Sequence, residues 1–264
     1  MLNKLRALFT PASARVPIVT AIPAGERVYA IGDIHGRADL FGALIAHVDA
    51  DDAARGNAQT TVILLGDLVD RGPDSAGVIA LARSWATRRP LRMLQGNHEE
   101  MFLNSFDDDN TLRHFLRFGG RETLLSYPIT PVEYERATIE ELQVLMQERV
   151  PAADIAFMQA MENLIQVGNY VFVHAGIRPG TPLDEQKGAD LRWIRGEFLH
   201  DPTPRDFAVV HGHTITQAAE MHPWRIGIDT GAFASGQLTA VGLQATDRWL
   251  VTAHDDTFGL TPLA

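Results

Sequence analysis

The chain has 264 residues, 45% of them hydrophobic, which is enough to bury the core of one large domain. It contains no cysteine, so disulfide bonds, thiolate metal sites and cysteine nucleophiles are excluded, and any metal must be held by nitrogen and oxygen. The net charge of -10 argues against the backbone of a nucleic acid as the main partner. No apolar run is long enough to cross a bilayer, and we expect a cytoplasmic protein with no transmembrane segment.

The first 24 residues differ from the rest of the sequence. They contain an apolar and basic pattern near helical spacing, formed by Leu2, Lys4, Leu5, Arg6, Leu8 and Phe9. Such a pattern fits a helix on a membrane surface or against a partner, but chain termini are more often loosely ordered. We therefore interpret residues 1–24 as a loosely ordered leader and residues 25–264 as a single domain.

Short β-type runs recur from Arg27 onward, and most of them end in a polar pair: VYAIGD, TVILLGD, LRMLQGNH, YVFVHAG, FAVVHGH and RIGIDTG. Helical patterns separate the early runs: LFGALIAHV and SAGVIALARSWA. Strands that are apolar throughout are buried on both faces, so this alternation predicts an α/β fold. The polar residues then gather at the carboxyl ends of the strands, where α/β sheets bind ligands.

Residues 100–166 form a different kind of segment, with three helical patterns: HFLRFGGRETLLSY, TIEELQVLMQERV and AADIAFMQAMENLI. We predict a helical cap inserted between strands. The acidic run DDDN at 107–110 lacks the glycine and distal glutamate of a calcium loop, and we expect a solvated loop there. After His213, three β-rich runs predict an antiparallel continuation of a sheet: RIGIDTGA, QLTAVGLQA and DRWLVTAHD.

Five strand-end clusters carry the candidate chemistry. In GDIHG, Asp33 and His35 are two residues apart after a buried strand, so both side chains point the same way and can hold one cation. In GDLVDRG, Asp67 ends the next strand, and its two oxygens can bridge two cations. Asn97 of GNHE, His174 of VHAG and His213 of HGHT follow later strands.

Each cluster alone is a weak signal, because a Gly-Asp pair after a strand is usually only a turn. A lone histidine, likewise, is more often structural than a ligand. Here every cluster follows a strand, and all of them would meet at one sheet edge. The combination predicts a dinuclear metal site.

The motifs GDIHG, GDLVDRG, GNHE, VHAG and GHT resemble the signature of calcineurin-like metallophosphoesterases, in particular the phosphoprotein phosphatase branch. The resemblance spans residues 28 to about 231. Within it, four further segments resemble bacterial serine/threonine phosphatase-like members: FGGRETLLSY, HAGIRPG, LRWIRGEF and IDTGA. The resemblance implies an α/β sandwich of two sheets flanked by helices, with the metals at one edge.

The resemblance also implies roles for individual residues. Two divalent transition-metal ions would be bound, the first by Asp33, His35 and Asp67. The second would be bound by Asp67, Asn97, His174 and His213. Manganese is the metal we expect, with iron or zinc as alternatives, since all three accept histidine and carboxylate. A hydroxide that bridges the cations would attack phosphorus directly, without a phosphoenzyme.

Two further residues are candidates for acid catalysis. His98 follows the ligand Asn97, and the side chains of neighbours on an extended loop diverge, which leaves His98 free to face the leaving oxygen as a general acid. The family assigns it this role. Asp70 would orient His98 and stabilise its protonated form, although it could also be a simple turn residue.

Four residues are candidates for substrate binding. The guanidinium of Arg71 suits two phosphoryl oxygens, and Asn97 would also face the substrate. Arg195 resembles the second phosphate-binding arginine of viral and bacterial members, and Arg178 competes with it. For these two, a structural ion pair is an equal alternative.

His211 and Asp229 lie close to the ligand motifs. His211 is two residues from His213 and on the same side of the strand, so it could support a ligand, but we favour a structural role. Asp229 could buttress a ligand histidine.

Three functions remain open at the level of the sequence. We favour a phosphoprotein phosphatase over a small-molecule phosphohydrolase such as a dinucleoside tetraphosphatase, and a non-catalytic scaffold comes last because every ligand position and His98 are intact. A dinucleotide hydrolase needs surfaces on which a base can stack. Six aromatic residues of the helical segment could provide them or could be helix core: Phe102, Phe106, Phe115, Phe118, Tyr127 and Tyr134. The sequence does not indicate an oligomeric state.

Overall fold

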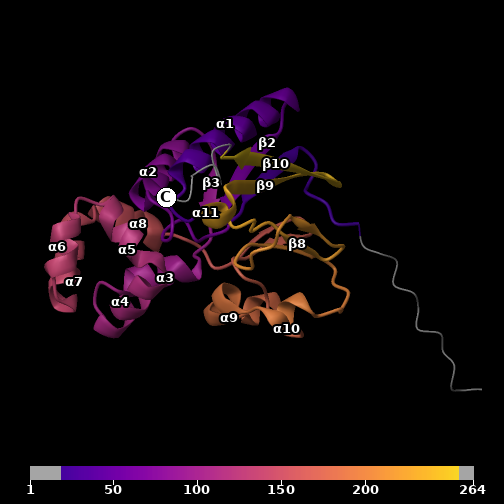
Figure 1. Ribbon diagram of the computed structural model, residues 1–264. Coiled ribbons are helices and arrows are strands. Elements are labelled where there is room, and N and C mark those ends of the chain that lie inside the picture. Colours follow the sequence, from indigo (N-terminus) through magenta and orange to yellow (C-terminus); the bar gives the residue numbers. More distant parts are fainter. Residues whose placement is uncertain (1–18, 256–264) are drawn as a thin grey trace, which may run out of the picture.

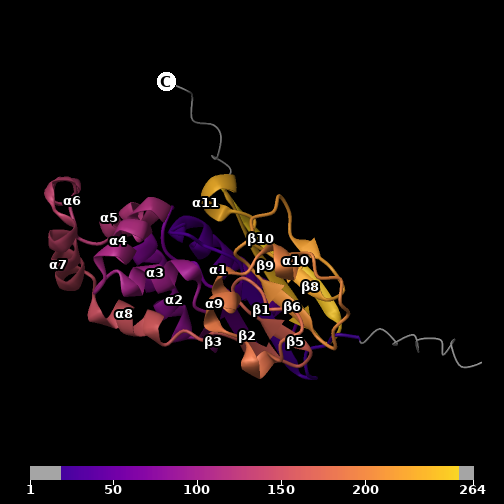
Figure 2. The ribbon, with the colours of Figure 1, turned by 90° about the horizontal axis from the view of Figure 1, so that it is seen from below.

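The structure of the chain is a computed structural model that describes residues 19–255, so most of the expected leader lies outside the described residues. Two five-stranded sheets pack face to face in its centre (Figures 1 and 2). This arrangement confirms the predicted two-sheet α/β sandwich. No helix among the described residues is long and apolar enough to span a membrane.

The first sheet has the order β10-β9-β1-β2-β3. Strands β1, β2 and β3 are parallel, whereas β9 pairs antiparallel with both β1 and β10, as the runs QLTAVGLQA and DRWLVTAHD predicted. The prediction was wrong for the third run, RIGIDTGA, which lies in the second sheet and pairs parallel with the strand at Ala208–His211. The strands are β1 (Glu26–Ile31), β2 (Gln59–Leu64), β3 (Leu91–Met93), β9 (Gln237–Gln244) and β10 (Asp247–His254).

The second sheet has the order β4-β5-β6-β8-β7. Strands β5, β6 and β8 are parallel, and β4 and β7 add antiparallel edges. The strands are β4 (Ile165–Val167), β5 (Tyr170–Phe172), β6 (Ala208–His211), β7 (Glu220–Met221) and β8 (Arg225–Gly227). The parallel strands of both sheets send their carboxyl ends toward the same region of the molecule.

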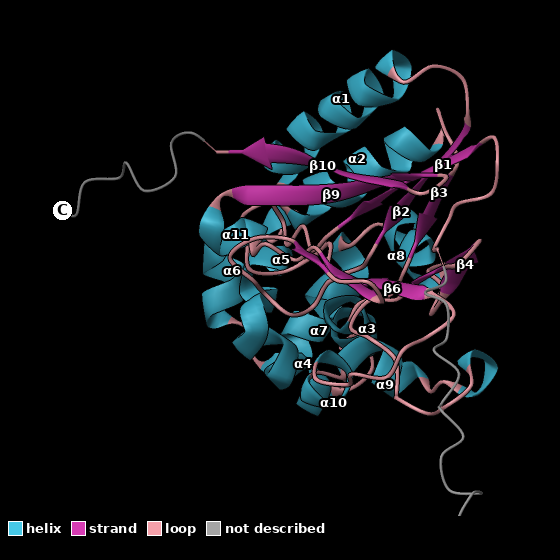
Figure 3. Ribbon diagram, turned by 90° about the vertical axis from the view of Figure 1, so that its right-hand side faces the viewer, coloured by secondary structure: helices cyan, strands magenta, loops and turns pink. Residues whose placement is uncertain are grey.

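Helices cover the outer faces of the sandwich, as Figure 3 shows for α1 above the first sheet. In β1, Tyr29 and Ile31 pack with helices α1 (Ala38–Ala54) and α2 (Ser75–Ala86). Val28 and Ala30, the alternate residues of β1, pack against the second sheet. Both faces of this apolar strand are therefore buried, as predicted. The outer face of the second sheet packs against α9 (Gly188–Trp193) and α10 (Gly196–Leu199).

A helical segment occupies the chain between β3 and β4 and lies at one side of the sandwich (Figures 1 and 2). Its helices are α3 (Asn97–Asn104), α4 (Asp109–Phe115), α5 (Arg121–Ser126), α6 (Pro131–Arg136), α7 (Ile139–Arg149) and α8 (Ala152–Gln159). The sequence predicted a cap at 100–166, but α3 begins earlier and β4 begins at Ile165. The reason for the early start is that Gly96 ends its strand run and caps α3 directly.

The run HFLRFGGRETLLSY does not form the continuous helix that its pattern suggests. A π-helical turn, Leu116–Gly120, separates α4 from α5, because Gly119 has a φ of 103°. Within DDDN, Asp108 caps α4 by accepting hydrogen bonds from the backbone of Asn110 (2.8 Å) and Thr111 (3.2 Å). The remaining short elements are a 3-10 turn at Leu183–Glu185 and α11 (Ala232–Ser235).

Candidate functional site

The predicted ligand residues lie together where the strands of both sheets end. Five come from the loops after β1, β2, β5 and β6, and the sixth, Asn97, begins α3 after β3. Each is between 1% and 6% exposed: Asp33, His35, Asp67, Asn97, His174 and His213. The structure therefore brings together side chains that are up to 180 residues apart, as in the hydrogen bonds from the His213 backbone to Asp33.

Asp67 lies between two groups of donor atoms. On one side, Nε2 of His35 is 3.6 Å from Oδ2 of Asp67. On the other side, Nε2 of His174 is 3.4 Å from Oδ1 of Asp67. The groups of described residues whose donor atoms could hold a metal ion are His35, Asp67 and His98, and Asp67, His174 and His213. One carboxylate shared by two groups is an arrangement suited to two cations.

The second group converges closely around His174. Its Nε2 lies 3.0 Å from Oδ1 of Asn97 and 3.2 Å from Nδ1 of His213. These are all atoms that can donate a lone pair to a cation. Nε2 of His213 is buried and has no hydrogen-bond partner among the described residues, although buried ring nitrogens normally have one.

The outward nitrogens of two histidines fix their tautomers. Nδ1 of His35 lies 2.8 Å from the Val69 carbonyl oxygen, and Nδ1 of His174 lies 2.8 Å from that of Leu65. Because a carbonyl oxygen only accepts hydrogen bonds, each Nδ1 carries a proton. Each Nε2 therefore points into the centre, which is the orientation of metal-binding histidines.

The charges of the centre favour a cation. Burial raises the pKa of Asp33, and the nearby carboxylate of Asp229 raises it further. Burial lowers the pKa of His174, but the adjacent carboxylate of Asp67 outweighs this effect and raises the pKa, which reflects the negative charge around the ring. Buried carboxylates require a compensating positive charge. Together with the nitrogen and oxygen donors, this requirement fits divalent metal ions.

The backbone of the site is strained. Six described residues other than glycine have a positive φ, and five of them belong to the predicted site: His35 (45°), Asp67 (51°), Asp70 (74°), Arg71 (69°) and His213 (62°). This conformation costs of order 1–3 kcal/mol for a residue with a side chain, and such residues cluster at functional sites. The backbone conformation that directs these side chains into the site therefore lowers the stability of the fold.

His98 and Asp70 form a buried pair beside the donor groups. Nδ1 of His98 is 2.6 Å from Oδ2 of Asp70, and Nε2 faces Oδ2 of Asp67 at 3.9 Å. Burial lowers the pKa of His98, but the carboxylates of Asp67 and Asp70 raise it above its usual value. The pair thus has the geometry of an imidazole oriented by a carboxylate, with its second nitrogen directed into the centre.

The three candidate arginines occupy different positions. The guanidinium of Arg71 reaches into the centre, where Nη1 is 2.9 Å from Nε2 of His35 and Nη2 is 2.9 Å from Nε2 of His98. Arg195 lies at the rim and donates from Nη1 to the backbone oxygen of His213 at 3.0 Å.

Arg178, by contrast, is held away from the donor groups. Its guanidinium forms ion pairs with Asp190 (2.6 Å) and Glu197 (2.5 Å). This is the structural alternative left open for Arg178, and these partners occupy the guanidinium nitrogens.

The structure identifies two residues of the site to which the sequence assigned no role. Glu99 is fully buried, and its carboxylate accepts hydrogen bonds from backbone N–H groups of Gly96 and of the loop that carries Asp67. Thr123 donates from its hydroxyl to Oδ1 of Asp70 at 2.6 Å. Glu99 lies in the motif GNHE and Thr123 lies in FGGRETLLSY, so the signal in the sequence that could have identified them was their place in these motifs.

His211 and Asp229 form hydrogen bonds to groups other than the predicted ligand histidines. His211 bonds through Nδ1 to the Gly212 carbonyl, and its ring packs edge-on against Phe198, which is the structural role that we favoured. The carboxylate of Asp229 accepts a hydrogen bond from the backbone of Gly231 and interacts with Asp33. Asp229 therefore supports the carboxylate of the predicted ligand Asp33 rather than a histidine.

The aromatic residues of the helical segment are mostly core. Phe102, Phe115 and Tyr127 are at most 5% exposed, and Phe106 and Tyr134 pack against them. Phe118 is 46% exposed, and the next residue, Gly119, accepts a hydrogen bond from the backbone of Arg71. Trp193, from the second sheet's side, is 41% exposed and lies edge-on to His213. The rim of the site therefore carries exposed aromatic surface.

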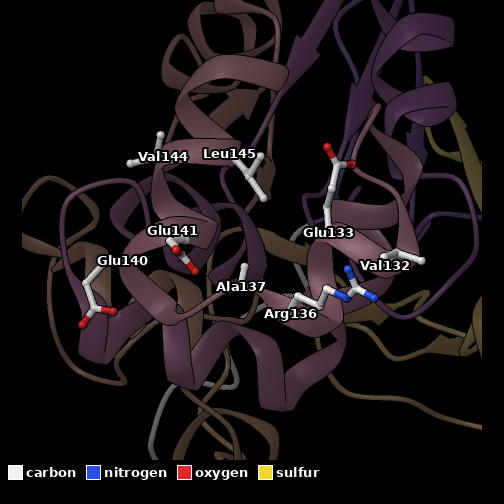
Figure 4. Close-up of a pocket in the computed structure, with 8 residues that line it drawn as sticks. All are labelled: Val132, Glu133, Arg136, Ala137, Glu140, Glu141, Val144 and Leu145. Carbon is white, nitrogen blue, oxygen red and sulfur yellow. The ribbon is translucent and has the colours of Figure 1, made fainter.

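An apolar groove elsewhere in the molecule is separate from this site. It lies between α6 and α7, with a volume of about 650 Å³, and Figure 4 shows its lining side chains, among them Val132, Val144 and Leu145. None of the predicted site residues lines it.

A two-sheet sandwich with buried carboxylate, imidazole and amide groups at the strand ends has the architecture of a metal-dependent hydrolase. Residues 26–230 match the family model described as calcineurin-like phosphoesterase. The match covers more than half of the chain, and the chain belongs to this family of metallophosphoesterases, as its motifs predicted. Members of the family typically use two divalent metal ions.

Relatives with two different activities are similar to this chain. Serine/threonine-protein phosphatase 1 of Salmonella typhimurium is 28% identical over 240 residues, which cover 83% of this chain and 93% of that protein. The asymmetrical bis(5'-nucleosyl)-tetraphosphatase of Bacillus subtilis is 28% identical over 231 residues, which cover 79% and 87%.

Solved structures share the fold. One, whose assignment as a diadenosine tetraphosphatase is provisional, has a TM-score of 0.60 at 22% identity, covering 91% of this chain and 97% of its own. A cold-active protein-tyrosine phosphatase of a psychrophilic Shewanella has a TM-score of 0.54 at 15% identity, covering 88% and 83%.

Proposed function

We propose that this chain hydrolyses phosphomonoesters of phosphoproteins at a centre of two divalent metal ions. The first ion would be held by Asp33, His35 and Asp67. The second would be held by the shared Asp67 with Asn97, His174 and His213. The observation that supports this assignment is the position of Asp67 between two groups of buried nitrogen donors, one with His35 and His98 and the other with His174 and His213.

The bound ions supply Lewis acidity and lower the pKa of water. The protein's own groups do the rest. Arg71 would bind phosphoryl oxygens with its guanidinium, which lies in the centre, and Asn97 and Arg195 would assist at the other side. His98 presents Nε2 to the centre and gives a proton to the leaving oxygen, while Asp70 holds Nδ1 and stabilises the charged ring.

The metal requirement can be tested directly. We expect turnover of p-nitrophenyl phosphate to cease after exhaustive chelation and to return with added Mn²⁺, because the donor set contains only nitrogen and oxygen. Undiminished turnover in the chelated protein would contradict the proposal. Equal restoration by Zn²⁺ or Fe²⁺ would leave the centre in place but remove the preference for manganese.

A phosphoprotein substrate is supported by the similarity to the Salmonella phosphatase and by the motifs of its branch. A dinucleoside tetraphosphate is the second candidate. It is supported by the Bacillus relative and by the exposed rings of Phe118 and Trp193, on which a base could stack.

A competition panel separates the two candidates. Phosphoserine, phosphothreonine and phosphotyrosine peptides would be compared with diadenosine tetraphosphate by relative kcat/KM, which is the quantity that defines specificity. We expect a phosphopeptide to be preferred. A higher kcat/KM for diadenosine tetraphosphate would establish the second candidate, and a Trp193→Ala variant would then lose affinity for it.

A further inference from the structure

The helical segment contacts the catalytic loop at Asp70, Arg71 and the start of α2. Arg71 donates from its backbone N–H to the Gly119 carbonyl at 3.1 Å. Ala76, in the first turn of α2, donates from its backbone to Oγ of Ser126 at 3.1 Å. Between these two contacts lies Thr123 of α5, whose side chain is fully buried. Residues 119–126 thus pack against the loop that carries the acid pair.

Thr123 makes three hydrogen bonds in this contact. Its Oγ1 lies 2.6 Å from Oδ1 of Asp70, 2.8 Å from the backbone nitrogen of Asp70 and 2.9 Å from Oγ of Ser75. The backbone nitrogen of Asp70 also lies 3.0 Å from Oγ of Ser75. All three residues are fully buried, so the bonds are shielded from bulk solvent.

The available protons determine the direction of each bond. The backbone N–H of Asp70 can only donate, and it is shared between the two hydroxyl oxygens. The one hydroxyl proton of Thr123 goes to Oδ1 of Asp70, because a carboxylate accepts the stronger bond. Ser75 then donates to Thr123. These hydrogen bonds leave Oδ2 of Asp70 as the acceptor for Nδ1 of His98 at 2.6 Å.

We propose that Thr123 is a positioning residue for acid catalysis, which fixes the Asp70 carboxylate so that Asp70 can hold His98 toward the leaving oxygen. The inference rests on the proposed function, since it requires His98 to act as the acid. Thr123 does not touch the substrate. Its action passes through Asp70, and it makes the helical segment a direct part of the catalytic geometry.

The dependence of the rate on the leaving group isolates this role. An alkoxide leaves poorly and needs a proton, whereas p-nitrophenolate leaves readily without one. A residue that serves the acid therefore matters for phosphoserine peptides far more than for p-nitrophenyl phosphate. A residue that only supports the fold, or the metal ligands, affects both substrates alike.

The test compares Thr123→Val with Thr123→Ser in the full chain loaded with Mn²⁺. Valine keeps the shape of threonine and removes the hydroxyl, and the Asp70 backbone keeps Ser75 as an acceptor, so folding should be retained. Thr239→Val is the matched control, because Thr239 is a buried threonine that bonds to Thr230 and Gln237 and has no contact with Asp70.

We expect kcat on a phosphoserine peptide to fall roughly ten- to a hundredfold in Thr123→Val, which is the factor that a hydrogen bond to a charged group contributes. The fall on p-nitrophenyl phosphate should be much smaller, KM and bound metal should stay near wild type, and Thr123→Ser should restore the rate. The control should leave the ratio of the two substrates unchanged.

Equal losses on both substrates in Thr123→Val, or no loss on either, would overturn the inference. His98→Ala distinguishes this outcome from a failure of the proposed function. We expect His98→Ala to lose about 10² to 10⁴ in rate on the phosphoserine peptide while it keeps its metal. If His98→Ala loses activity selectively on the phosphoserine peptide and Thr123→Val does not, only the role of Thr123 is refuted. If neither variant shows this selective loss, the role of His98 as general acid is refuted as well.

Discussion

Glu99 allows a stability prediction that can be calculated from its contacts. Each oxygen of its carboxylate accepts two backbone N–H groups. Oε2 accepts from Asp67 at 2.8 Å and from Gly96 at 2.9 Å, and Oε1 accepts from Leu68 at 2.7 Å and from Val69 at 3.3 Å. The carboxylate is thus the acceptor that holds the loop of Asp67 against the start of α3.

The substitution Glu99→Gln replaces one of these oxygens by an amide nitrogen, which cannot accept. Two buried N–H groups then lose their acceptor, and each such loss costs about 1–3 kcal/mol. The smaller loss results when the nitrogen takes the place of Oε1, because the bond to Val69 is long. Burial raises the pKa of Glu99, so removing the charge returns part of this cost. We expect a net destabilisation of about 2–4 kcal/mol.

Urea unfolding in the presence of EDTA measures this quantity without a contribution from bound metal. Glu100→Gln is the matched control, since the Glu100 side chain is 27% exposed and pairs with Arg192, and we expect it to cost less than about 1 kcal/mol. If Glu99→Gln unfolds within about 0.5 kcal/mol of wild type, the four backbone contacts do not stabilise the loop as argued.

Three more predictions follow from contacts at the site. Arg195→Ala should raise KM for a phosphopeptide roughly tenfold, because the Arg195 guanidinium lies at the rim beside His213. Arg178→Ala should leave KM within about twofold, because Arg178 is held by exposed ion pairs. If steady-state kinetics give the larger effect for Arg178→Ala, the two arginines exchange roles. Burial lowers the pKa of His211 to about 4 from a usual value near 6.5, so the unfolded chain takes up this proton first and stability should fall by about 3 kcal/mol as the pH drops from 6.5 to 4. In His211→Gln this part of the pH dependence of unfolding should be absent, and an unchanged slope would refute it. Gly212→Ala should weaken metal binding by about 10- to 100-fold in a metal titration, because the added Cβ would lie 2.0 Å from Oδ1 of Asp33. An unaltered metal affinity would show that the Asp33 side chain can move aside.

The sequence predicted the fold and the gathering of the ligand residues because both depend on local pattern. Apolar strands followed by polar loops are typical of a parallel sheet that is buried on both faces and has the carboxyl ends of its strands at one edge. Once Asp33, Asp67 and His174 each follow a strand of this kind, the parallel order of β1, β2 and of β5, β6 brings them together.

The parts that could not be predicted depend on contacts between distant segments. Thr123 and Asp70 are 53 residues apart, and nothing in the local pattern around either of them indicates their hydrogen bond. Nothing in the motif GNHE indicates that the Glu99 carboxylate accepts four backbone hydrogen bonds, because three of them form only when the distant Asp67 loop folds over it. The break at Gly119 was missed because glycine is tolerated within helical patterns, and only its φ shows that the helix ends.

Both the first sheet and the candidate site combine segments from early and late parts of the sequence, so neither is complete until most of the chain has been synthesised. The proposed second metal site needs a donor from His213, and the first sheet needs β9, which pairs with β1 at the opposite end of the described chain. A nascent chain that has emerged from the ribosome only as far as the helical segment therefore has neither a finished sheet nor a complete binding site. In the proposed centre, the second ion can acquire its full set of ligands only after synthesis of residue 213, and an ion bound there would link the early and late halves of the chain.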